Sequence, residues 1–347
     1  MLYLGIDLHS KSFTVNGFDK TTGEAFFIKK VANEAEAIRE AFAAVPSPRA
    51  GVLEAGTNAL AMYRLLAPYF AELMIVAPNK VWDRRRQTGP KTDRHDALGL
   101  ALALAKGDLR AIYRPDLTLQ EGRSLVRGRL QVTRAITRVV SQLYALIRSY
   151  GLLISKKALT QQGRAALAKV TLPGQAATLL EYALARLDLL QTQERALEQQ
   201  IALQAAADPI CQRLMTIPSV GSFTALTLRV EIGDIRRFKS ADALINYSGL
   251  VPQVFQSNEK VHYGRLTKAG NALLRYVAVV FAQNVIGNRL DTPFKRKYYR
   301  ACHTHDINEV KVMIARDFLA TVHSMWTHET VWEYPRPVVT RTPSSVA

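Results

Sequence analysis

The order of strand-like and helix-like segments in the first hundred residues constrains the fold more than any other feature. Short apolar segments at 2–7, 12–18 and 25–31, separated by turn residues, predict three neighbouring strands. A helix is then expected over 33–45, capped by Asn33 and ended before Pro46, followed by a strand at 49–55, a helix at 58–70 and a strand at 72–78. Neighbouring strands followed by βα units predict a mixed sheet with helices on its faces, which is an α/β domain.

The segment KTDRHDALGLALALAKG, residues 91–107, completes this domain. Its leucines at 98, 100, 102 and 104 alternate as they would in a strand, but the stretch is rich in Ala and Leu and has no β-branched residue. Lys106 and Gly107 are typical of a helix C-terminus. We therefore predict a helix here, with Asp93 and Asp96 at its start.

A different pattern runs from about 119 to 205. Apolar residues recur every seven positions at 125, 132, 139 and 146, and a second seam passes through 136, 143 and 150. After a break at Pro173-Gly174, apolar residues at 187, 190, 197 and 201 continue at helical spacing. The pattern predicts two long helices that pair with each other or with another subunit, as in a coiled coil. The first helix carries several arginines, which are compatible with a solvated face or with a surface for nucleic acid.

The remaining residues, from about 208 to 328, predict a mostly helical domain. LMTIPSVGSFTALTL (214–228) is typical of a helix, a tight turn and a second helix, and amphipathic helices are expected at 267–286 and 307–326. The prolines after 334 indicate a frayed tail. We expect a fold of the α/β plus α class, with domains at 1–115, 116–207 and 208–330 and a flexible tail at 331–347.

The charge of the chain indicates its partner. The sequence has 46 Lys and Arg against 29 Asp and Glu, a formal net charge of +17, which favours a polyanion and most often nucleic acid. An anionic membrane surface is the competing interpretation, but no stretch approaches the roughly 20 apolar residues of a spanning helix. Asp7 interrupts any signal-peptide core, and two cysteines cannot form a disulfide framework. We expect a soluble, cytoplasmic protein of a prokaryotic cell with no membrane partner.

Four carboxylates stand out in this basic chain. Asp93 and Asp96 could simply cap their helix, with Asp93 as the N-cap. They also lie on one side of the helix, since positions three apart differ by about 60°. Asp7 ends an apolar strand and Glu54 lies inside an apolar run, where a carboxylate needs a cation or a donor. Salt bridges to arginines would satisfy these acids as well.

The alternative is that the four acids converge at one edge of the sheet and share divalent metal. Oxygen ligands suit Mg²⁺ or Mn²⁺, and two such ions could clamp the attacking and leaving oxygens of a phosphodiester. This order of acids is the usual arrangement of ribonuclease H-like nucleases. The basic run Arg84-Arg85-Arg86 and Lys91 fits phosphate attraction, although a solvated loop would look the same. The nearby His9 and His95 receive no catalytic role.

Several blocks resemble one family. GIDLHSK, VLEAGTN and KTDRHDALGLA are similar to the three acidic blocks of the DEDD-type insertion-sequence transposases, which include the pilin-gene invertases and the bridge-RNA-guided recombinases. The segment from IPSVGSFTALTL to KAGNALLRY is similar to their C-terminal transposase domain. The resemblance implies a RuvC-like N-terminal domain with Asp7, Glu54, Asp93 and Asp96 as its metal-binding tetrad. It covers nearly the whole chain.

The resemblance also implies a nucleophilic serine, and Ser257 in GLVPQVFQSNEK occupies that place. This serine would attack a DNA phosphate and form a covalent phosphoserine link. Asn258 stands where the family usually has glycine, and Ser219 replaces a glycine of the family's Pro-Gly-Val-Gly turn. Candidate phosphate contacts are the backbone at the helix start near Gly221 and the side chains of three basic residues, Lys260, Arg265 and Lys268.

The implied partners are donor and target DNA, a guide RNA encoded by the element, and further copies of the chain as a dimer or tetramer. Base pairing would then choose the sequence while the protein grips the backbone. Two other functions compete with this recombinase. One is a RuvC-like junction-resolving endonuclease that uses water as its nucleophile, and the other is a non-catalytic basic architectural protein. A zinc site built from Cys302 and the later histidines matches no standard spacing.

Overall fold

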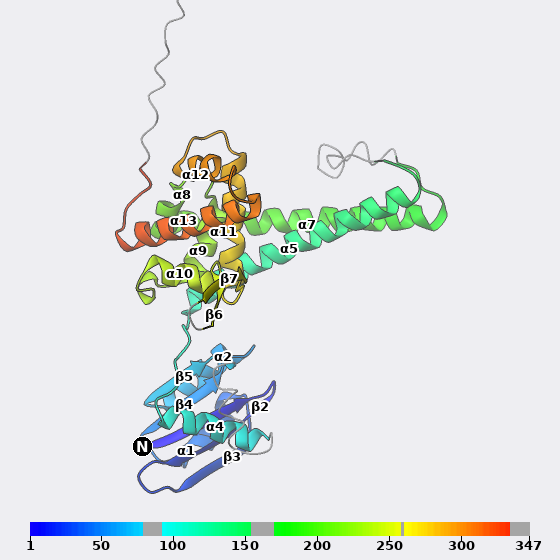
Figure 1. Ribbon diagram of the computed structural model, residues 1–347. Coiled ribbons are helices and arrows are strands. Elements are labelled where there is room, and N and C mark those ends of the chain that lie inside the picture. Colours follow the sequence, from blue (N-terminus) through cyan, green and yellow to red (C-terminus); the bar gives the residue numbers. More distant parts are fainter. Residues whose placement is uncertain (79–91, 154–169, 258–259, 334–347) are drawn as a thin grey trace, which may run out of the picture. The chain divides into compact units, whose positions relative to one another are not determined.

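The computed structural model describes residues 1–78, 92–153, 170–257 and 260–333 (Figure 1). The chain divides into two compact units, Met1–Arg114 and Pro115–Ala347. The long helices and the C-terminal helices fall in the same unit, so the separate middle domain that we expected is not set apart by this division. Each unit is described by itself.

The N-terminal unit is built on a five-stranded mixed sheet with the order β3-β2-β1-β4-β5. β1 lies at the centre, where it pairs antiparallel with β2 and parallel with β4, and β5 continues the parallel part. The predicted mixed sheet is thereby confirmed. The strands are β1 (Leu2–Leu8), β2 (Ser12–Asp19), β3 (Ala25–Ala32), β4 (Arg49–Glu54) and β5 (Glu72–Val76).

Helices cover both faces of this sheet. On one face, Leu4 and Ile6 of β1 belong to a core that includes Ile38 of α1 (Ala35–Ala43) and Leu66 of α2 (Ala59–Leu66). A short 3₁₀ turn, η1 (Ala67–Tyr69), follows α2. On the other face, Val52 packs against the predicted helix α4 (Asp93–Ala105). Each fully buried aliphatic side chain contributes about 1.5–3 kcal/mol, so these two layers fix the sheet between them.

The start of α1 differs from our expectation. Its N-cap is Glu34, without a side-chain capping bond, and not Asn33. The side-chain amide of Asn33 donates instead to the backbone oxygens of His9 and Ser10, at 3.0 and 3.2 Å. These bonds turn the Asn33 side chain towards the loop that follows β1, and its oxygen Oδ1, the atom that would cap the helix, makes no hydrogen bond within the described residues.

The C-terminal unit begins with the two predicted long helices, α5 (Leu117–Ser149) and α7 (Gly174–Ala207), which run side by side (Figure 1). Val139, Leu143 and Ile147 of α5 share a buried core with apolar residues of α7, but the seven-residue seam does not hold along the whole helix. Near its start α5 also packs on α9, where a Cβ added to Gly122 would approach Val230 to 2.7 Å. The buried face there shifts to Leu119, Val126 and Leu130, and the expected seam residues Leu125 and Val132 are only half-buried.

Within the described residues, seven further helical segments and one hairpin belong to this unit. The predicted helix–turn–helix at 214–228 is confirmed, and so are two amphipathic helices, although the first begins at Ala272 and not at 267 because Asn271 caps it. The β-hairpin was not predicted. The elements are α8 (Pro209–Met215), α9 (Ser222–Ile232), η5 (Ile235–Arg237), α10 (Ala241–Ser248), β6 (Pro252–Ser257), β7 (Lys260–Leu266), α11 (Ala272–Gly287), α12 (Pro293–Ala301) and α13 (Ile307–Thr327).

Stacked aromatic rings form the centre of this bundle. The rings of Phe281 in α11 and Phe318 in α13 are stacked with their centroids 3.8 Å apart, and Phe294 of α12 meets Phe281 edge-on. Across the described ranges, none of the helices combines the length and the apolar character that crossing a membrane requires. The predicted tail after 333 lies outside the described residues.

Candidate functional site

A cluster of possible metal ligands lies where β1 ends. Asp7, His9 and Asp93 each offer one ligand atom, and these atoms all lie within 4.8 Å of one another. His9 Nε2 is 3.2 Å from Asp93 Oδ2 and 3.6 Å from Asp7 Oδ2. The end of the central strand, the loop after it and the start of α4 thus meet at one point.

Asp93 is the first residue of α4 but not its cap. Thr92 is the N-cap, and its side-chain oxygen accepts a hydrogen bond from the backbone N–H of His95. Thr92 Oγ1 also lies 2.6 Å from His95 Nδ1. The interpretation of Asp93 as the N-cap is therefore wrong, because the side chain of Thr92 caps the helix. The Asp93 side chain remains 61% exposed and turned to His9.

Two residues of the sheet bring the start of α4 down onto β1. Gly5 in β1 faces the helix, and a Cβ there would lie 1.8 Å from the backbone oxygen of Ala97, so the close approach requires glycine. Asn16, which pairs with Gly5 across β1 and β2, is buried and donates its side-chain N–H to the backbone oxygen of Arg94 at 2.8 Å. Together they fix the turn that carries Asp93.

Asparagines also fix the loop that carries His9. The backbone oxygen of His9 accepts hydrogen bonds from the side-chain amides of Asn33 and Asn58, both at 3.0 Å. We did not predict a role for Asn16 or Asn58 in the site. The available signals were an asparagine inside the apolar strand SFTVNGF and the asparagine that closes the block VLEAGTN.

The other two predicted acids lie close in the fold but outside the cluster. The last register pair of β1 and β4 is Ile6 with Leu53, so Asp7 and Glu54 follow at the carboxyl ends of neighbouring parallel strands. Glu54 Oε1 is shielded from solvent. Asp96 lies one turn into α4 and is half-buried. The described residues thus bring Asp7 and Asp93 together and add His9, without joining Glu54 or Asp96 to that group.

The donor set suits a divalent cation. Two carboxylates held by different elements, the half-buried Asp7 and the exposed Asp93, lie together in a chain of net charge +17 that could have paired them with arginine. Hard cations such as Mg²⁺ take oxygen ligands, and Mn²⁺ also accepts an imidazole nitrogen. Asp7 and Asp93 are the residues that would hold such an ion, with His9 beside them.

The candidates in the C-terminal unit lie on a hairpin and two helix starts. Ser257 is the last residue of β6 and pairs with Lys260, the first residue of β7. Arg265 near the end of β7 is exposed, as is Lys268, which adopts φ 51°. Gly221 is the N-cap of α9. The remaining phosphate candidates, Arg84, Arg85, Arg86 and Lys91, lie outside the described residues.

The tight turn before α9 accommodates its serine. Ser219 adopts a left-handed backbone with φ 71°, the conformation that a glycine takes most easily. Its hydroxyl oxygen accepts a hydrogen bond from the side-chain amide of Asn288 at 3.1 Å. The replacement of glycine at this position is therefore supported by a partner on another element.

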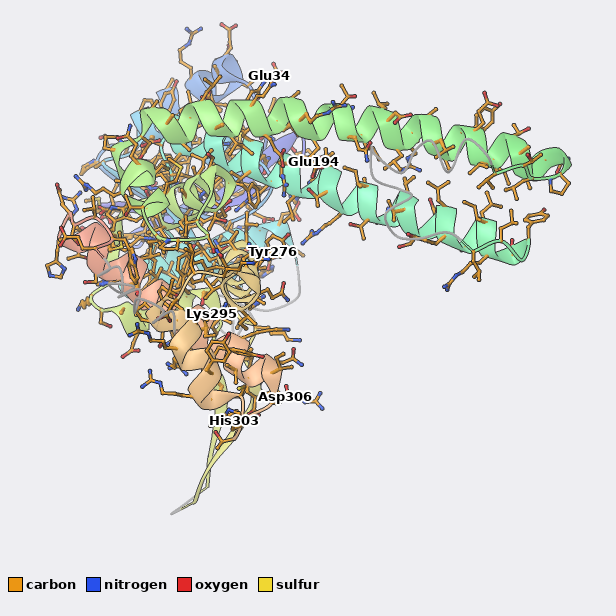
Figure 2. The ribbon with its side chains drawn as sticks, turned by 90° about the horizontal axis from the view of Figure 1, so that it is seen from above. Glu34, Glu194, Tyr276, Lys295, His303 and Asp306 are labelled. Carbon is orange, nitrogen blue, oxygen red and sulfur yellow. The ribbon has the colours of Figure 1, made fainter. Side chains whose placement is uncertain are left out.

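Several arginines of α5 point into the protein. Arg127 forms a two-pronged pair with Glu231 of α9, at 2.9 and 3.1 Å, and Arg123 donates to the backbone oxygen of Val230 at 2.7 Å. Burial lowers the pKa of Arg123. Arg129 pairs with Glu198, and it also approaches Glu194 of α7, which is labelled in Figure 2. Arg123 and Arg129 are thus largely buried in contacts within the unit, whereas the Arg127 side chain is 56% exposed and the surface for nucleic acid stays a prediction.

Comparisons with known proteins agree with this architecture. Residues 4–151 match the IS110 DEDD family model, described as a transposase, and residues 211–300 match the model of the IS116/IS110/IS902 transposase family. The mixed sheet is consistent with the ribonuclease H-like fold expected for a DEDD transposase domain.

Curated relatives extend along most of the chain. The transposase for insertion sequence element IS1111A of Coxiella burnetii is 26% identical over 80% of this chain and 75% of its own length. A probable family 20 transposase of Pseudomonas aeruginosa is 26% identical over 82% of this chain and 83% of its own. The transposase for insertion sequence element IS1328 of Yersinia enterocolitica is 23% identical over 81% and 82%. The chain belongs to the IS110/IS116 family of insertion-sequence transposases, of the DEDD type.

Proposed function

We propose that this transposase cuts and rejoins DNA at an acidic centre formed by Asp7, Glu54, Asp93 and Asp96, with Mg²⁺ or Mn²⁺ as its cofactor. The observation that carries the proposal is the meeting of Asp7 and Asp93, from segments far apart in the sequence, within 4.8 Å of each other and of His9. Like charges held this close favour the binding of a cation between them.

The four carboxylates of the centre have different roles because they stand at different positions. Asp7 and Asp93 hold the cation, and Glu54 and Asp96 are placed one strand and one helical turn away from them. A bound divalent cation would supply Lewis-acid stabilisation of the charge that develops on a phosphate during cleavage. Asn16, Asn33 and Asn58 keep the two carboxylates in register by fixing the helix start and the loop.

We further propose Ser257 as the nucleophile of a covalent step. Its hydroxyl gives up a proton, its oxygen bonds to phosphorus, and the bridging DNA oxygen leaves and takes up a proton. Reversal with a new DNA end restores the serine and rejoins the strand without an external energy source. The DEDD type assigns the chemistry to carboxylates, so Ser257 acts together with them and does not replace them. The position of Ser257 on a hairpin with exposed Arg265 supports this role.

RNA guidance and self-association belong to the same proposal. A guide RNA paired with donor and target DNA would meet a chain of net charge +17, including the exposed Arg134 and Arg138 of α5. Recombination of two duplexes requires more than one protomer, as a dimer or tetramer. Exposed apolar residues along α7, Leu179, Tyr182, Leu189 and Leu203, are suited to contacts between copies.

The competing function is a junction-resolving endonuclease with the same acidic centre and water as its nucleophile. The two differ in one product, a covalent link between protein and DNA. The test combines purified protein, Mg²⁺, RNA from the DNA that flanks the element and a labelled end-junction duplex, resolved on a denaturing protein gel. Wild type is compared with Ser257→Ala and with Ser141→Ala, an exposed serine of α5 as the matched control.

A labelled band at protein mass in wild type and Ser141→Ala, but not in Ser257→Ala, establishes the serine step. Cleaved DNA without an adduct in any of the three proteins establishes the water-using endonuclease. Asp93→Asn is included in the same gel and should lack both the adduct and the cleaved DNA, because either mechanism needs the acidic centre.

A further inference from the structure

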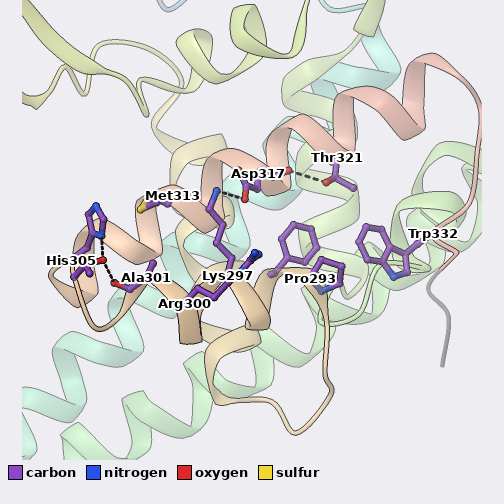
Figure 3. A pocket seen from close by; sticks show the side chains of 11 residues that line it. Pro293, Lys297, Arg300, Ala301, His305, Met313, Asp317, Thr321 and Trp332 are labelled. Atoms are coloured by element: carbon purple, nitrogen blue, oxygen red, sulfur yellow. Dashed lines mark hydrogen bonds and ion pairs between the residues drawn. The ribbon is translucent and has the colours of Figure 1, made fainter. Parts of the chain in front are cut away.

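A second concave site lies in the C-terminal unit, between α12 and α13 (Figure 3). It encloses about 670 Å³, within the usual range for small-molecule sites. Neither the acidic centre nor Ser257 contributes to its lining. The site is therefore separate from the residues proposed above for DNA cleavage.

One end of this cavity is aromatic. The rings of Phe294 and Trp332 are stacked, with centroids 5.4 Å apart and an interplanar angle of 18°. The segment after α13 is held there because the backbone N–H of Trp332 donates to Thr216 Oγ1 at 2.8 Å. The Trp332 ring is thus held in place by Phe294 and by the bond to Thr216. A flat aromatic surface that is held in this way is suited to stacking a planar ring.

The wall beside it is cationic. Lys297 and Arg300 project from α12 into the cavity (Figure 3), and Lys297 is paired with Asp317 of α13 at 2.5 Å. Arg300 is exposed and makes no ion pair with any carboxylate in the described ranges. His305 at the far end has Nδ1 2.8 Å from Thr304 Oγ1, which orients its ring. Two cations and one carboxylate leave the cavity suited to an anion next to a planar group.

We propose that this cavity binds one unpaired nucleotide of a nucleic-acid strand. The base stacks at the aromatic end against Trp332, and the phosphate is bound by Arg300. A paired base cannot enter, since its ring faces are covered by its neighbours in the duplex. DNA and RNA offer the same phosphate and planar base, so either strand is a source of the ligand.

The test uses the full-length protein in EDTA, so that cleavage at the acidic centre plays no part. The probes are hexamers of thymidine or of uridine with one 5-iodouracil base, supplied single-stranded or in a duplex. After irradiation, the crosslinked peptide is identified by mass spectrometry. The variants are Arg300→Ala, Trp332→Ala, Trp332→Phe and Arg289→Ala, an exposed arginine of the same unit that does not line the cavity.

We expect single strands to crosslink at the peptide that contains Trp332 or Phe294, and duplexes to crosslink there at least tenfold less. Arg300→Ala should weaken binding about tenfold, because a hydrogen bond to a charged phosphate is lost. Arg289→Ala should change binding less than twofold. Trp332→Phe should keep the crosslink that Trp332→Ala loses, because phenylalanine preserves the stacking surface.

Comparison of the thymidine and uridine hexamers identifies which strand is the source, and equal yields mean that the site accepts both. Equal crosslinking by duplex and single strand overturns the proposal. So does an Arg300→Ala protein that behaves like Arg289→Ala, or a crosslink confined to peptides outside the cavity. These outcomes are independent of whether the protein forms the covalent adduct described above.

Discussion

Glu231 and Asp93 show two opposite uses of a carboxylate in the same chain. Glu231, in the C-terminal unit, has a side chain that is 1% exposed, and it accepts hydrogen bonds from Arg127 and from the side-chain amide of Asn271 at 2.7 Å. Asp93, in the N-terminal unit, is 61% exposed and faces a single histidine. A buried charge must be satisfied by the protein itself, whereas an exposed one can serve a ligand.

The difference explains how the two carboxylates are supported. Glu231 connects α9 to α5 through Arg127 and to the capped start of α11 through Asn271. Its charge therefore stabilises the packing of these helices. Among the residues that the structure describes, Asp93 receives no such set of donors. Its surroundings, Asn16 and Gly5, fix the backbone beneath it and leave the carboxylate to the site.

The largest effect should follow from Asp93→Asn. Removal of one negative charge weakens cation binding and should lower the rate of DNA cleavage about a thousandfold, about 4 kcal/mol of transition-state stabilisation. The melting temperature should stay within a degree or two, because Thr92 and not Asp93 caps α4. Normal DNA cleavage by this variant would show that Asp93, like Glu231, is a structural carboxylate, and would contradict the difference drawn between them.

Glu231→Ala should have the converse result. It leaves the partly buried Arg123 and the side chain of Arg127 without their partner, and should lower the free energy of unfolding by about 3 kcal/mol. Denaturant unfolding measures this change. Exposed Glu36, which pairs with Arg39 on the same helix, is the control, and Glu36→Ala should cost less than 1 kcal/mol. Equal costs at the two positions would contradict the assignment of Glu231 as a structural carboxylate.

Asn16→Leu should affect the site by displacing the backbone at the start of α4. Without the hydrogen bond to the Arg94 oxygen, the start of α4 is less well placed, and the affinity for Mn²⁺ should fall about 10–100-fold, as for other residues that orient metal ligands. Titration followed by electron paramagnetic resonance measures this without any DNA. Thr227→Val, at a buried position of the C-terminal unit, is the control and should leave the affinity within twofold.

The smallest effect concerns Cys211, a fully buried residue of α8 in the same unit as Glu231. Burial raises the pKa of the Cys211 thiol from its ordinary value of 9.0 to about 12, so the thiol stays protonated in the folded state. Its contribution to stability is constant below pH 9 and is lost as the pH rises from 9 towards 12, because only the unfolded chain then loses the proton. At pH 8 a thiol reagent should modify Cys302 and spare Cys211 until denaturant is added. Rapid reaction of both cysteines in the native protein would contradict the burial of Cys211.

The sheet was predictable because its strands are short, apolar and separated by clear turn residues. The helix over 93–105 was predictable from its alanines and leucines despite the alternation. The acids Asp7 and Asp93 could be paired in advance because strand ends and helix starts meet at the edge of such a sheet. Those elements depend on local pattern, which a single sequence contains.

The rest depends on contacts between distant residues. Nothing local distinguishes Thr92 from Asp93 as the cap, or shows that the Asn33 amide turns to the His9 oxygen and away from its own helix. The seven-residue seam of α5 was wrong near its start because that part of the helix also packs on α9, a partner chosen by the tertiary fold. The hairpin that carries Ser257 was missed because its strands, PQVFQS and KVHYGRL, are rich in polar residues and lack the apolar runs that mark the strands of the N-terminal sheet.

The boundary between Arg114 and Pro115 has a consequence for genetics. The acidic cluster belongs wholly to one compact unit and Ser257 wholly to the other. One copy of the chain with Asp7→Ala and a second copy with Ser257→Ala each retain one intact unit. When the two units that act on a strand come from different copies, such a pair complements, and two inactive alleles together restore transposition.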